Sequence, residues 1–413
     1  MIDHKPDENI QEHIGANPIS GFVAPGMEPV LRAFKENFAR RGEIGAACAV
    51  YRGAEVLVDL YGGYREPGFE WRADTLACVH SSTKGISAVA MAMAVSRGYF
   101  ELDAPIATYW PEFGCNGKEA ITAREVFAHS AGLPVIEEPI GIDTVADLDL
   151  LADVLSRQTP QWQPGTRHGY HGWTIGFLEN EILRRTDPAG RSISQFVQEE
   201  IAGPLGVEFY IGLPDSVADE RIANEISGWR MIREGLLDNP AVFLALLVPK
   251  WLMPNNLTRL MLTNPPELGV IGNFHRRDVR KVEIPAGNGI GSARAMARIM
   301  SECATGGALF GLSQDVIDEI EKPHPWTDSP PRDALMKTPM LYQMGFCKPG
   351  KHFAVGATER SYFAPGAGGN MCFADPDTGI GFGYALNHFG GKLSGDGDPR
   401  EHALRTALFE ALR

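Results

Sequence analysis

The sequence lacks the features that mark several protein classes. None of its six cysteines belongs to a Cys-x-x-Cys pair, so neither a zinc ribbon nor a dithiol redox site of that type is expected. Scattered single thiols are typical of a reducing compartment, and residues 1–8 are polar, without the apolar run of a signal peptide. These absences predict a cytoplasmic protein.

Long apolar runs and positive charge are also scarce. The longest membrane-like stretch runs from Ala241 to Val248 and is stopped by Pro249 and Lys250, so it is too short to span a bilayer. Lys and Arg number 38 against 52 Asp and Glu, giving a net charge of −14. Because phosphate binding needs clustered Lys and Arg, we expect no nucleic-acid and no membrane partner. A small-molecule partner remains, and whether the chain forms a homodimer is left open.

The order of the predicted elements indicates two subdomains. A helix is expected over residues 27–41, a hairpin over 45–60 and a final helix over 399–413, while residues 1–26 are predicted to be an extended polar arm. Residues 99–285 instead show short helical patterns broken by Pro and Gly. We therefore predict a discontinuous α/β subdomain, 1–98 plus 286–413, and a mostly helical subdomain, 99–285.

Segment 230–265 within the helical subdomain mixes apolar residues with prolines. One interpretation is a lid-like set of short helices over a site. The alternative is a partner-binding surface, because six apolar side chains could form one exposed patch: Phe243, Leu244, Leu246, Leu247, Trp251 and Leu252.

The strongest chemical signal is a Ser-x-x-Lys motif at Ser81 and Lys84. It follows a strand-like segment, 75–79, and opens an apolar helical run over 88–95. Ser81 would then lie in the first turn of a buried helix, with Lys84 one turn later on the same side. A serine hydroxyl needs a base within reach, and burial lowers the pKa of a lysine so that it can be that base. The motif alone also fits a chance surface pair, but the apolar helix favours catalysis.

Tyr170 is the second candidate. It follows the turn at Pro164 and Gly165 and precedes a helix expected to begin near Trp173. A phenol can relay a proton between nucleophile and leaving group if nearby lysine charge lowers its pKa. The alternative is a core tyrosine.

Two histidines near Tyr170 form a His-x-x-His pair, His168 and His171. Such a pair can bind a metal, but no third ligand with a recognisable spacing accompanies it. We therefore predict no metal and no cofactor.

A stretch of small residues, 364–369, is the third candidate. Its small side chains allow a backbone to approach a ligand closely, and backbone N–H groups there can stabilise an oxyanion. We expect the amides of Ser81 and Ala367 to form such an oxyanion hole. The alternative is an ordinary glycine-rich turn.

Three such features in this order resemble the serine β-lactamase and penicillin-binding-protein superfamily, and within it the class C β-lactamase-related, family VIII carboxylesterases. The resemblance covers about residues 27–413 and includes the stretches 121–134 and 201–206. It implies an α+β, β-lactamase-like fold, with an antiparallel sheet flanked by helices and a mostly helical insertion. It also implies that Ser81 is the nucleophile, Lys84 the general base and Tyr170 the partner acid/base.

Two positions depart from the motifs of that superfamily. Gly172 stands where the second motif has Asn, and Ala364 stands where the third motif, which falls on residues 364–366, has Lys or His. The missing cation argues most strongly against a β-lactam or acidic-peptide substrate and least against a neutral ester. We take His171, Gly172, Ala364 and Gly366 as candidate substrate-binding residues.

The residues and the resemblance together predict a serine carboxylesterase that acts on neutral esters through an acyl-enzyme. Alternatives are a transesterase, acyltransferase or amide hydrolase of secondary metabolism, and then a β-lactamase or D-amino-acid peptidase. A non-catalytic binding or scaffold protein is the alternative from another class. The two motif departures favour it, whereas intact Ser81, Lys84 and Tyr170 oppose it. No Gly-x-Ser-x-Gly elbow is present, so an α/β-hydrolase triad is not supported.

Overall fold

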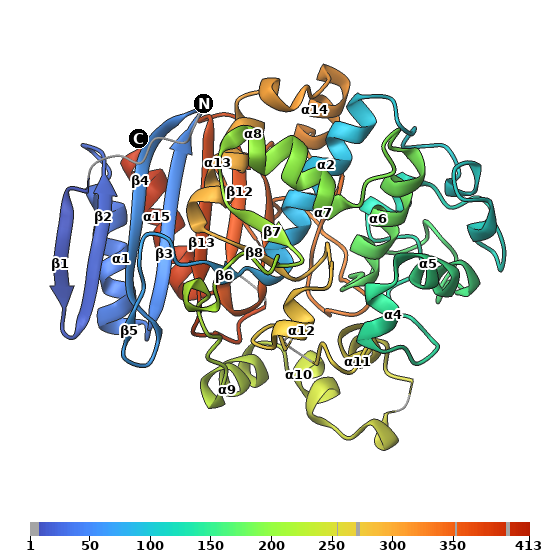
Figure 1. Cartoon of the computed structure of the whole chain (residues 1–413), viewed down its shortest axis with the longest axis horizontal. Helices are drawn as coiled ribbons and strands as arrows, with labels where there is room; N and C mark the ends of the chain where they lie inside the picture. Colours follow the sequence, from blue (N-terminus) through green and yellow to red (C-terminus); the bar gives the residue numbers. More distant parts are fainter. Residues whose placement is uncertain (1–7, 254, 270–272, 352, 394–396) are drawn as a thin grey trace.

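A large antiparallel sheet runs through the protein (Figure 1). The computed structural model describes residues 8–253, 255–269, 273–351, 353–393 and 397–413. The strands of this sheet are β1 (Ile10–Ile14), β2 (Asn17–Val23), β3 (Gly45–Arg52), β4 (Glu55–Glu66), β5 (Phe69–Glu70), β9 (Tyr342–Gln343), β10 (Phe346–Cys347), β11 (Tyr362–Pro365), β12 (Met371–Asp375) and β13 (Ile380–Leu386). Their order is β1-β2-β4-β3-β13-β12-β11-β10-β9, with β5 paired to β4. N- and C-terminal segments therefore meet at the pair β3–β13.

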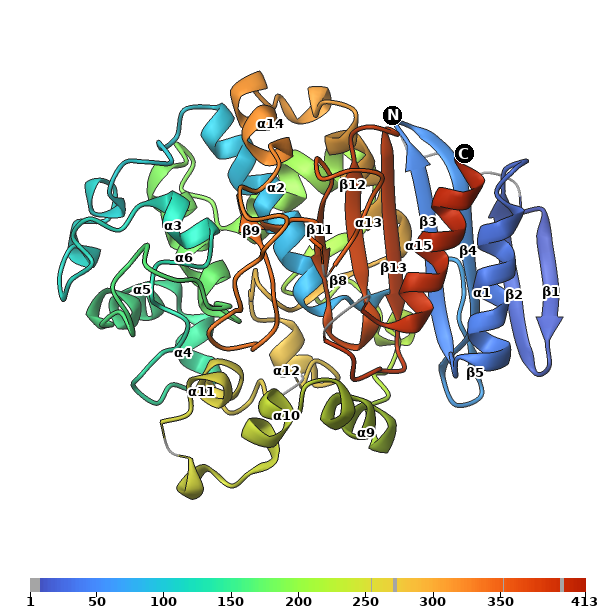
Figure 2. The same cartoon turned by 180° about the vertical axis from the view of Figure 1, so that it is seen from behind.

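Helices cover both faces of the sheet. Helices α1 (Glu28–Arg40) and α15 (Pro399–Ala411) lie side by side on one face (Figure 2). Helices α2 (Thr83–Ser96) and α13 (Ala293–Ala304) pack against the other. Side chains alternate between these two cores: Phe363 joins the core of α1 and α15, whereas its neighbours Tyr362 and Ala364 join that of α2 and α13. The antiparallel sheet flanked by helices is thus confirmed.

A small antiparallel sheet is formed by β6 (Ala77–Cys78), β7 (Phe209–Ile211) and β8 (Gly289–Gly291). Most of the remaining helices fall between β6 and β8 in the order of the chain. They are α3 (Ala123–Phe127), α4 (Ile142–Ala146), α5 (Leu148–Arg157), α6 (Thr174–Thr186), α7 (Ile193–Phe196), α8 (Gly203–Leu205), α9 (Trp229–Asp238), α10 (Pro240–Leu247), α11 (Leu257–Thr263) and α12 (Arg277–Arg280), with α14 (Gln314–Glu321) after α13. The division into two subdomains stays a prediction.

Helix α2 is buried from residue 83 to residue 94, because its run of Ala, Val and Met leaves no polar face for solvent. It ends where Gly98 takes a left-handed conformation, with φ of 71°. The Gly98 amide donates to the Val95 carbonyl over 2.9 Å. Glycine accepts this conformation without steric cost, so Gly98 ends the helix.

The prediction of an extended arm at the N-terminus is wrong for residues 8–26. Residues 10–23 form the hairpin β1–β2, and β2 pairs with the edge of β4. The side chain of Asn9 exchanges hydrogen bonds with the backbone of Val23 at 2.9 and 3.0 Å and closes the hairpin. Strand β2 buries Ile19, Gly21 and Val23 on one face, but Pro18 and the glycine within the strand obscure this short alternation in the sequence. Residues 1–7 of the predicted arm lie outside the described residues.

Two further findings concern helices and thiols. In the described part of the chain, no helix combines the length and the apolar character needed to cross a bilayer. All six cysteines are free thiols, as expected from their spacing.

Candidate active site

Ser81 and Lys84 lie at the start of α2 and point into one pocket. Ser81 belongs to a 3₁₀ turn, His80–Ser82, which leads directly into the helix. The Lys84 Nζ lies 3.3 Å from the Ser81 Oγ and donates to the carbonyls of Gly172 and Ala286 over 2.8 and 2.7 Å. The lysine is 5 % exposed, and backbone oxygens fix its amine beside the serine.

Burial lowers the pKa of Lys84 to about 7, although Glu179 and Cys347 act in the opposite direction. Burial likewise raises the pKa of Glu179, on α6, to about 8, and Lys84 opposes that shift. The lysine therefore has a substantial neutral fraction near pH 7, which a proton acceptor needs. Sequence reasoning missed Glu179, because its proximity to Lys84 arises only when α6 packs against α2.

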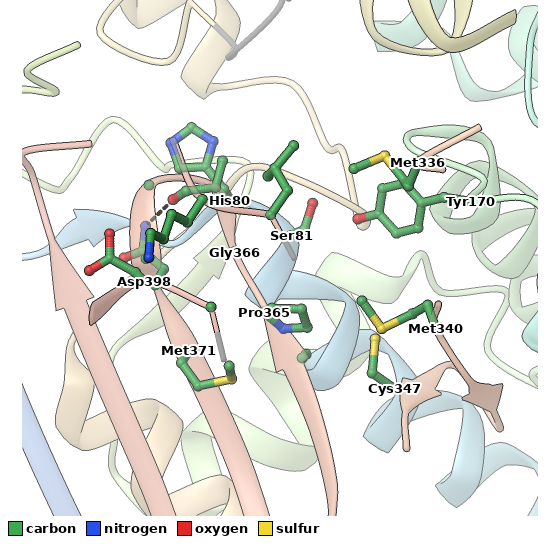
Figure 3. Close-up of a pocket in the computed structure, with 18 of the residues that line it drawn as sticks. His80, Ser81, Tyr170, Met336, Met340, Cys347, Pro365, Gly366, Met371 and Asp398 are labelled. Carbon is green, nitrogen blue, oxygen red and sulfur yellow. Dashed lines mark hydrogen bonds between the residues drawn. The ribbon is translucent and has the colours of Figure 1, made fainter. Parts of the chain in front are cut away.

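Tyr170 lies across the pocket from the serine (Figure 3). Its ring centroid is 4.7 Å from the Lys84 Nζ, and its phenol is hydrogen-bonded to the Ser81 side chain. Its backbone amide donates to the Asp333 carboxylate over 2.8 Å.

The condition considered for Tyr170 in the sequence, a pKa lowered by nearby lysine charge, is not met. Burial raises the pKa of the phenol well above its usual range, and the hydrogen bond with Ser81 offsets this only in part. Desolvation disfavours the phenolate, and a lysine that is itself partly neutral supplies little compensating charge. Tyr170 is thus a protonated donor at neutral pH.

His171, a predicted substrate-binding residue, lies outside the pocket lining among the described residues. Its Nε2 accepts from the Leu133 amide over 3.0 Å, and its Nδ1 lies 2.7 Å from the Gly169 carbonyl. Burial lowers the pKa of His171 to about 4, so the ring is neutral at pH 7. The histidine thus fixes the backbone of the neighbouring loops, and we withdraw it as a substrate contact.

Gly172 also lies outside the described pocket lining, but it contacts the lysine through its carbonyl. A Cβ placed on Gly172 would lie 2.8 Å from the Cγ of Met261, on helix α11. The space that an asparagine side chain needs is therefore filled by a buried methionine of segment 230–265. Backbone carbonyls, rather than a side-chain amide, orient Lys84.

The third predicted segment forms the edge of the pocket beside Ser81 (Figure 3). The Ala364 carbonyl at the end of β11 accepts from the Ser82 hydroxyl over 3.0 Å. A Cβ on Gly366 would lie 2.3 Å from the Val79 carbonyl, so only glycine allows this close approach. Ser81 and Ala367 both line the pocket, and their amides as an oxyanion hole stay a prediction.

The pocket has a volume of about 200 Å³ and a mostly apolar lining. Segment 230–265 contributes Met231, Val242, Phe243, Leu246 and Leu262. Methionines from other elements add to it: Met336, Met340 and Met371. The charged residues of the described lining, apart from Lys84 and the histidines, are Lys392, Asp398 and Glu401. The pocket therefore suits an apolar group beside the serine.

Outside the pocket, the same segment exposes apolar side chains. Leu244, Leu247 and Leu252 are about half exposed and Trp251 is 77 % exposed, whereas Phe243 is buried. One side of the segment thus lines the pocket and the other faces solvent, and its roles as a lid or as a partner-binding surface stay predictions.

Known proteins resemble this chain in fold and, at about 30 % identity, in sequence. A family model described as Beta-lactamase matches residues 25–407. An esterase/beta-lactamase of Mycobacterium tuberculosis, LipL, is 28 % identical over 396 residues, covering 94 % of this chain and 87 % of LipL. A penicillin-binding-protein homolog from Caulobacter crescentus superposes with a TM-score of 0.80 at 31 % identity, covering 95 % of this chain and 99 % of that one.

A family VIII carboxylesterase superposes with a TM-score of 0.77 at 28 % identity and covers 95 % of this chain and 99 % of its own. The family match extends over nearly the whole chain and includes the segments that carry Ser81, Tyr170 and Ala364. The fold is β-lactamase-like, as the motifs implied. The chain therefore belongs to the beta-lactamase family and is a serine hydrolase of the β-lactamase and esterase superfamily.

Proposed function

We propose that this enzyme is a carboxylesterase that cleaves neutral esters through an acyl-enzyme on Ser81. The observation that carries the proposal is the contact of Ser81 with a buried lysine of lowered pKa inside an apolar pocket. The esterase names of LipL and of the family VIII carboxylesterase support the same reaction class.

Acylation begins when the neutral Lys84 amine accepts the Ser81 proton and Oγ attacks the ester carbonyl. The oxyanion accepts hydrogen bonds from the amides of Ser81 and Ala367. The intermediate collapses, the C–O bond of the ester breaks, and Tyr170 donates its phenolic proton to the departing alkoxide. Lys84 returns a proton to Tyr170, and water then attacks the acyl-enzyme by the same relay in reverse.

Substrate preference follows from the charges of the pocket. Ala364 supplies no cation beside the serine, and the charged residues of the described rim comprise one base and two acids. A substrate carboxylate would therefore have no charge-assisted partner at the position of residue 364. Apolar side chains instead favour an uncharged acyl or alkyl group.

The test is a panel of p-nitrophenyl esters compared with nitrocefin and a D-amino-acid amide. We expect the esters to be the best substrates, a fluorophosphonate probe to label Ser81, and Ser81→Ala to lose activity by at least about three orders of magnitude while it stays folded. Labelling without turnover of any substrate would favour the scaffold alternative, and wild-type turnover by Ser81→Ala would show that the nucleophile lies elsewhere, with Ser82 next to test.

A further inference from the structure

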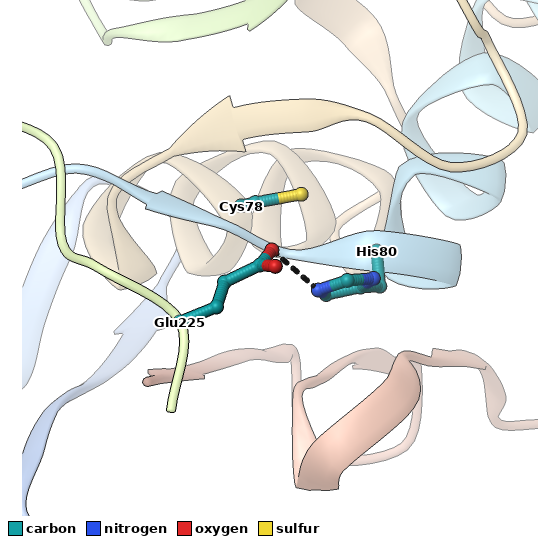
Figure 4. A group of neighbouring side chains, drawn as sticks. All are labelled: Cys78, His80 and Glu225. Carbon is teal, nitrogen blue, oxygen red and sulfur yellow. Dashed lines mark ion pairs between the residues drawn. The ribbon is translucent and has the colours of Figure 1, made fainter. Parts of the chain in front are cut away.

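Three side chains of metal-binding type meet just before the nucleophile. Cys78 lies on β6, His80 in the turn that follows, and Glu225 in the segment between residue 221 and α9 (Figure 4). One ligand atom from each residue lies within 4.8 Å of the other two. Cys78 and His80 are buried, and the Glu225 side chain is 12 % exposed.

We propose that Cys78, His80 and Glu225 bind a thiophilic divalent cation such as Zn²⁺, at a site separate from the acyl-transfer residues. Thiolate, imidazole and carboxylate are the three side-chain ligand types that Zn²⁺ prefers. One thiolate and one carboxylate also neutralise the two charges of the ion, so a buried site carries no net charge. Binding releases the Cys78 thiol proton and also the proton that the His80 ring holds in its ion pair with Glu225, which frees the Nε2 lone pair for the metal.

The first supporting observation is the geometry of a buried ion pair. The His80 Nε2 and the Glu225 Oε1 form an ion pair at 2.9 Å, yet the two atoms are not aligned as a hydrogen bond in the described structure. A buried ion pair without an aligned hydrogen bond recovers little of the free energy that its desolvation costs. A cation that accepts lone pairs from both atoms satisfies them together.

The second supporting observation is that the fold positions the ligands in advance. Backbone bonds on both sides of Glu225 hold its segment: Ala223 donates to Leu76 over 2.8 Å, and Ile226 donates to Asn387 over 2.7 Å. The His80 ring makes edge contacts with two aromatic rings, at centroid distances of 5.5 Å from Phe274 and 4.9 Å from Phe389. An apolar shell of this kind limits ligand rotation. The partly exposed Glu225 marks the side from which an ion enters.

The proposed site differs from the metal expectation drawn from the sequence. That expectation considered His168 and His171, and His171 uses both ring nitrogens on backbone groups. Cys78 and His80 are two residues apart, whereas Glu225 is far along the chain, so no spacing pattern predicts the cluster. Ser81, Lys84 and Tyr170 are not among the ligands, so the proposal stands or falls independently of the ester chemistry.

The experiment titrates the whole protein, dialysed against EDTA, with Co²⁺, whose thiolate complexes absorb in the near ultraviolet. We expect one equivalent to bind with a thiolate-to-cobalt charge-transfer band, and Zn²⁺ to displace it. Cys78→Ser should abolish the band, whereas Cys303→Ser, a matched change at another buried free thiol, should retain it. Ser81→Ala should also retain it, which separates this result from the esterase proposal.

A second measurement covers the case in which Cys78→Ser does not fold. Glu225→Gln preserves the shape of the side chain and should weaken Co²⁺ binding by at least about ten-fold. Saturating Zn²⁺ should raise the Tm of the wild type, since a ligand that binds only the folded state stabilises it, and should raise that of Glu225→Gln less. No band in the wild type, or an unchanged band in Cys78→Ser or Glu225→Gln, would show that the cluster is an ion pair beside a thiol.

Discussion

Helices α2 and α10 both contain a continuous apolar run but have different surroundings. The run covers residues 88–95 of α2, after a first turn that carries Thr83, Lys84 and Ser87, and it covers all of α10. Every residue of α2 from 83 to 94 is buried, because the sheet covers one side and α6 and α7 cover another. In α10 the residues Val242, Phe243 and Ala245 are buried, whereas Leu244 is 49 % and Leu247 is 50 % exposed.

An apolar helix is favoured by burial, but its composition alone does not tell whether the rest of the described fold covers it. It also separates two tasks in the site. Helix α2 holds Ser81 and Lys84 in a fixed geometry, with backbone carbonyls around the amine. Helix α10 and its neighbours determine which apolar groups fit beside the serine. Changes on the α2 side should therefore affect the chemistry, and changes on the α10 side should affect substrate choice.

The largest effects are expected on the α2 side. Lys84→Ala and Tyr170→Phe should each lower kcat for a p-nitrophenyl ester by roughly two to four orders of magnitude, the usual range for a positioned acid or base. If the two residues form one proton relay, the double variant should lose far less than the product of the single losses. Losses that multiply would contradict a shared relay, and unchanged circular dichroism is the control for folding.

The pH profile tests the same lysine without removing it. Only the neutral amine accepts the Ser81 proton, and burial lowers the pKa of Lys84 to about 7. The value of kcat/KM should therefore rise as the pH increases through about 7 and then level off. The ionised form of Glu179 raises the lysine pKa, but the Glu179 pKa of about 8 leaves only part of this carboxyl ionised near pH 7. Glu179→Gln should therefore move this limb slightly to lower pH, and a limb that does not move would show that Glu179 is protonated where the lysine titrates.

A smaller effect is expected where the two regions meet, at Gly172 and Met261. Gly172→Asn places a side chain 2.8 Å or less from the Met261 Cγ, and such overpacking costs about 1–3 kcal/mol of unfolding free energy. Met261→Ala removes the side chain that occupies this space, but the cavity that it leaves lowers the unfolding free energy as well. In the double variant the asparagine fills the gap, so the combined loss should be smaller than the sum of the two single losses. Urea denaturation measures all three variants, and additive losses would mean that α11 does not occupy the asparagine space.

Much of the framework was predictable from local patterns. The helix over 27–41, the hairpin at Arg52 and Gly53 and the final helix after Pro399 follow from periodicity and turn residues, and all three are confirmed. The places of Ser81, Lys84 and Tyr170 around one pocket followed from motifs read together. Their catalytic roles stay predictions.

What the sequence did not predict depends on contacts between distant segments. Met261 against Gly172, Glu179 near Lys84 and the cluster of Cys78, His80 and Glu225 each join residues from separate elements without a fixed spacing. The raised pKa of Tyr170 could not be predicted either, because it results from the depth of burial, which is a property of the packed structure.

A smaller effect is expected for nitrocefin, whose carboxylate finds no cation at position 364. Charge-assisted hydrogen bonds to a carboxylate contribute roughly 1.5–3 kcal/mol, so their absence at Ala364 should weaken recognition of acidic substrates about ten- to a hundred-fold. The wild type should therefore hydrolyse nitrocefin more slowly than its best neutral ester. Nitrocefin turnover as fast as that of the ester would show that another residue replaces the cation, with Lys392 in the pocket lining the first to examine.

Ala364→Lys is the corresponding gain-of-function variant. It should raise kcat/KM for nitrocefin more than for a neutral ester. The gain should be modest, because Ala364 is buried close against α2. A Cβ placed on Gly85 of that helix would lie only 2.9 Å from the Ala364 Cβ, so little space is left for a longer side chain. Ala364→Met, which has similar length and no charge, is the matched control. An equal gain in both variants would assign the effect to shape rather than to charge.

The smallest effect is expected on the outer face of α10. Leu247→Ser changes a half-exposed side chain that is absent from the described pocket lining, so the unfolding free energy should change by no more than about 0.5 kcal/mol. Val89→Ser, at a fully buried position of α2, should cost several times more, because it removes apolar contacts and buries a hydroxyl. Urea denaturation of the two variants at two protein concentrations measures both quantities. A loss in Leu247→Ser as large as that in Val89→Ser, and growing with protein concentration, would mean that a second copy of the chain covers α10 in solution. Helix α10 would then be covered on its outer face as well, as α2 is within the fold.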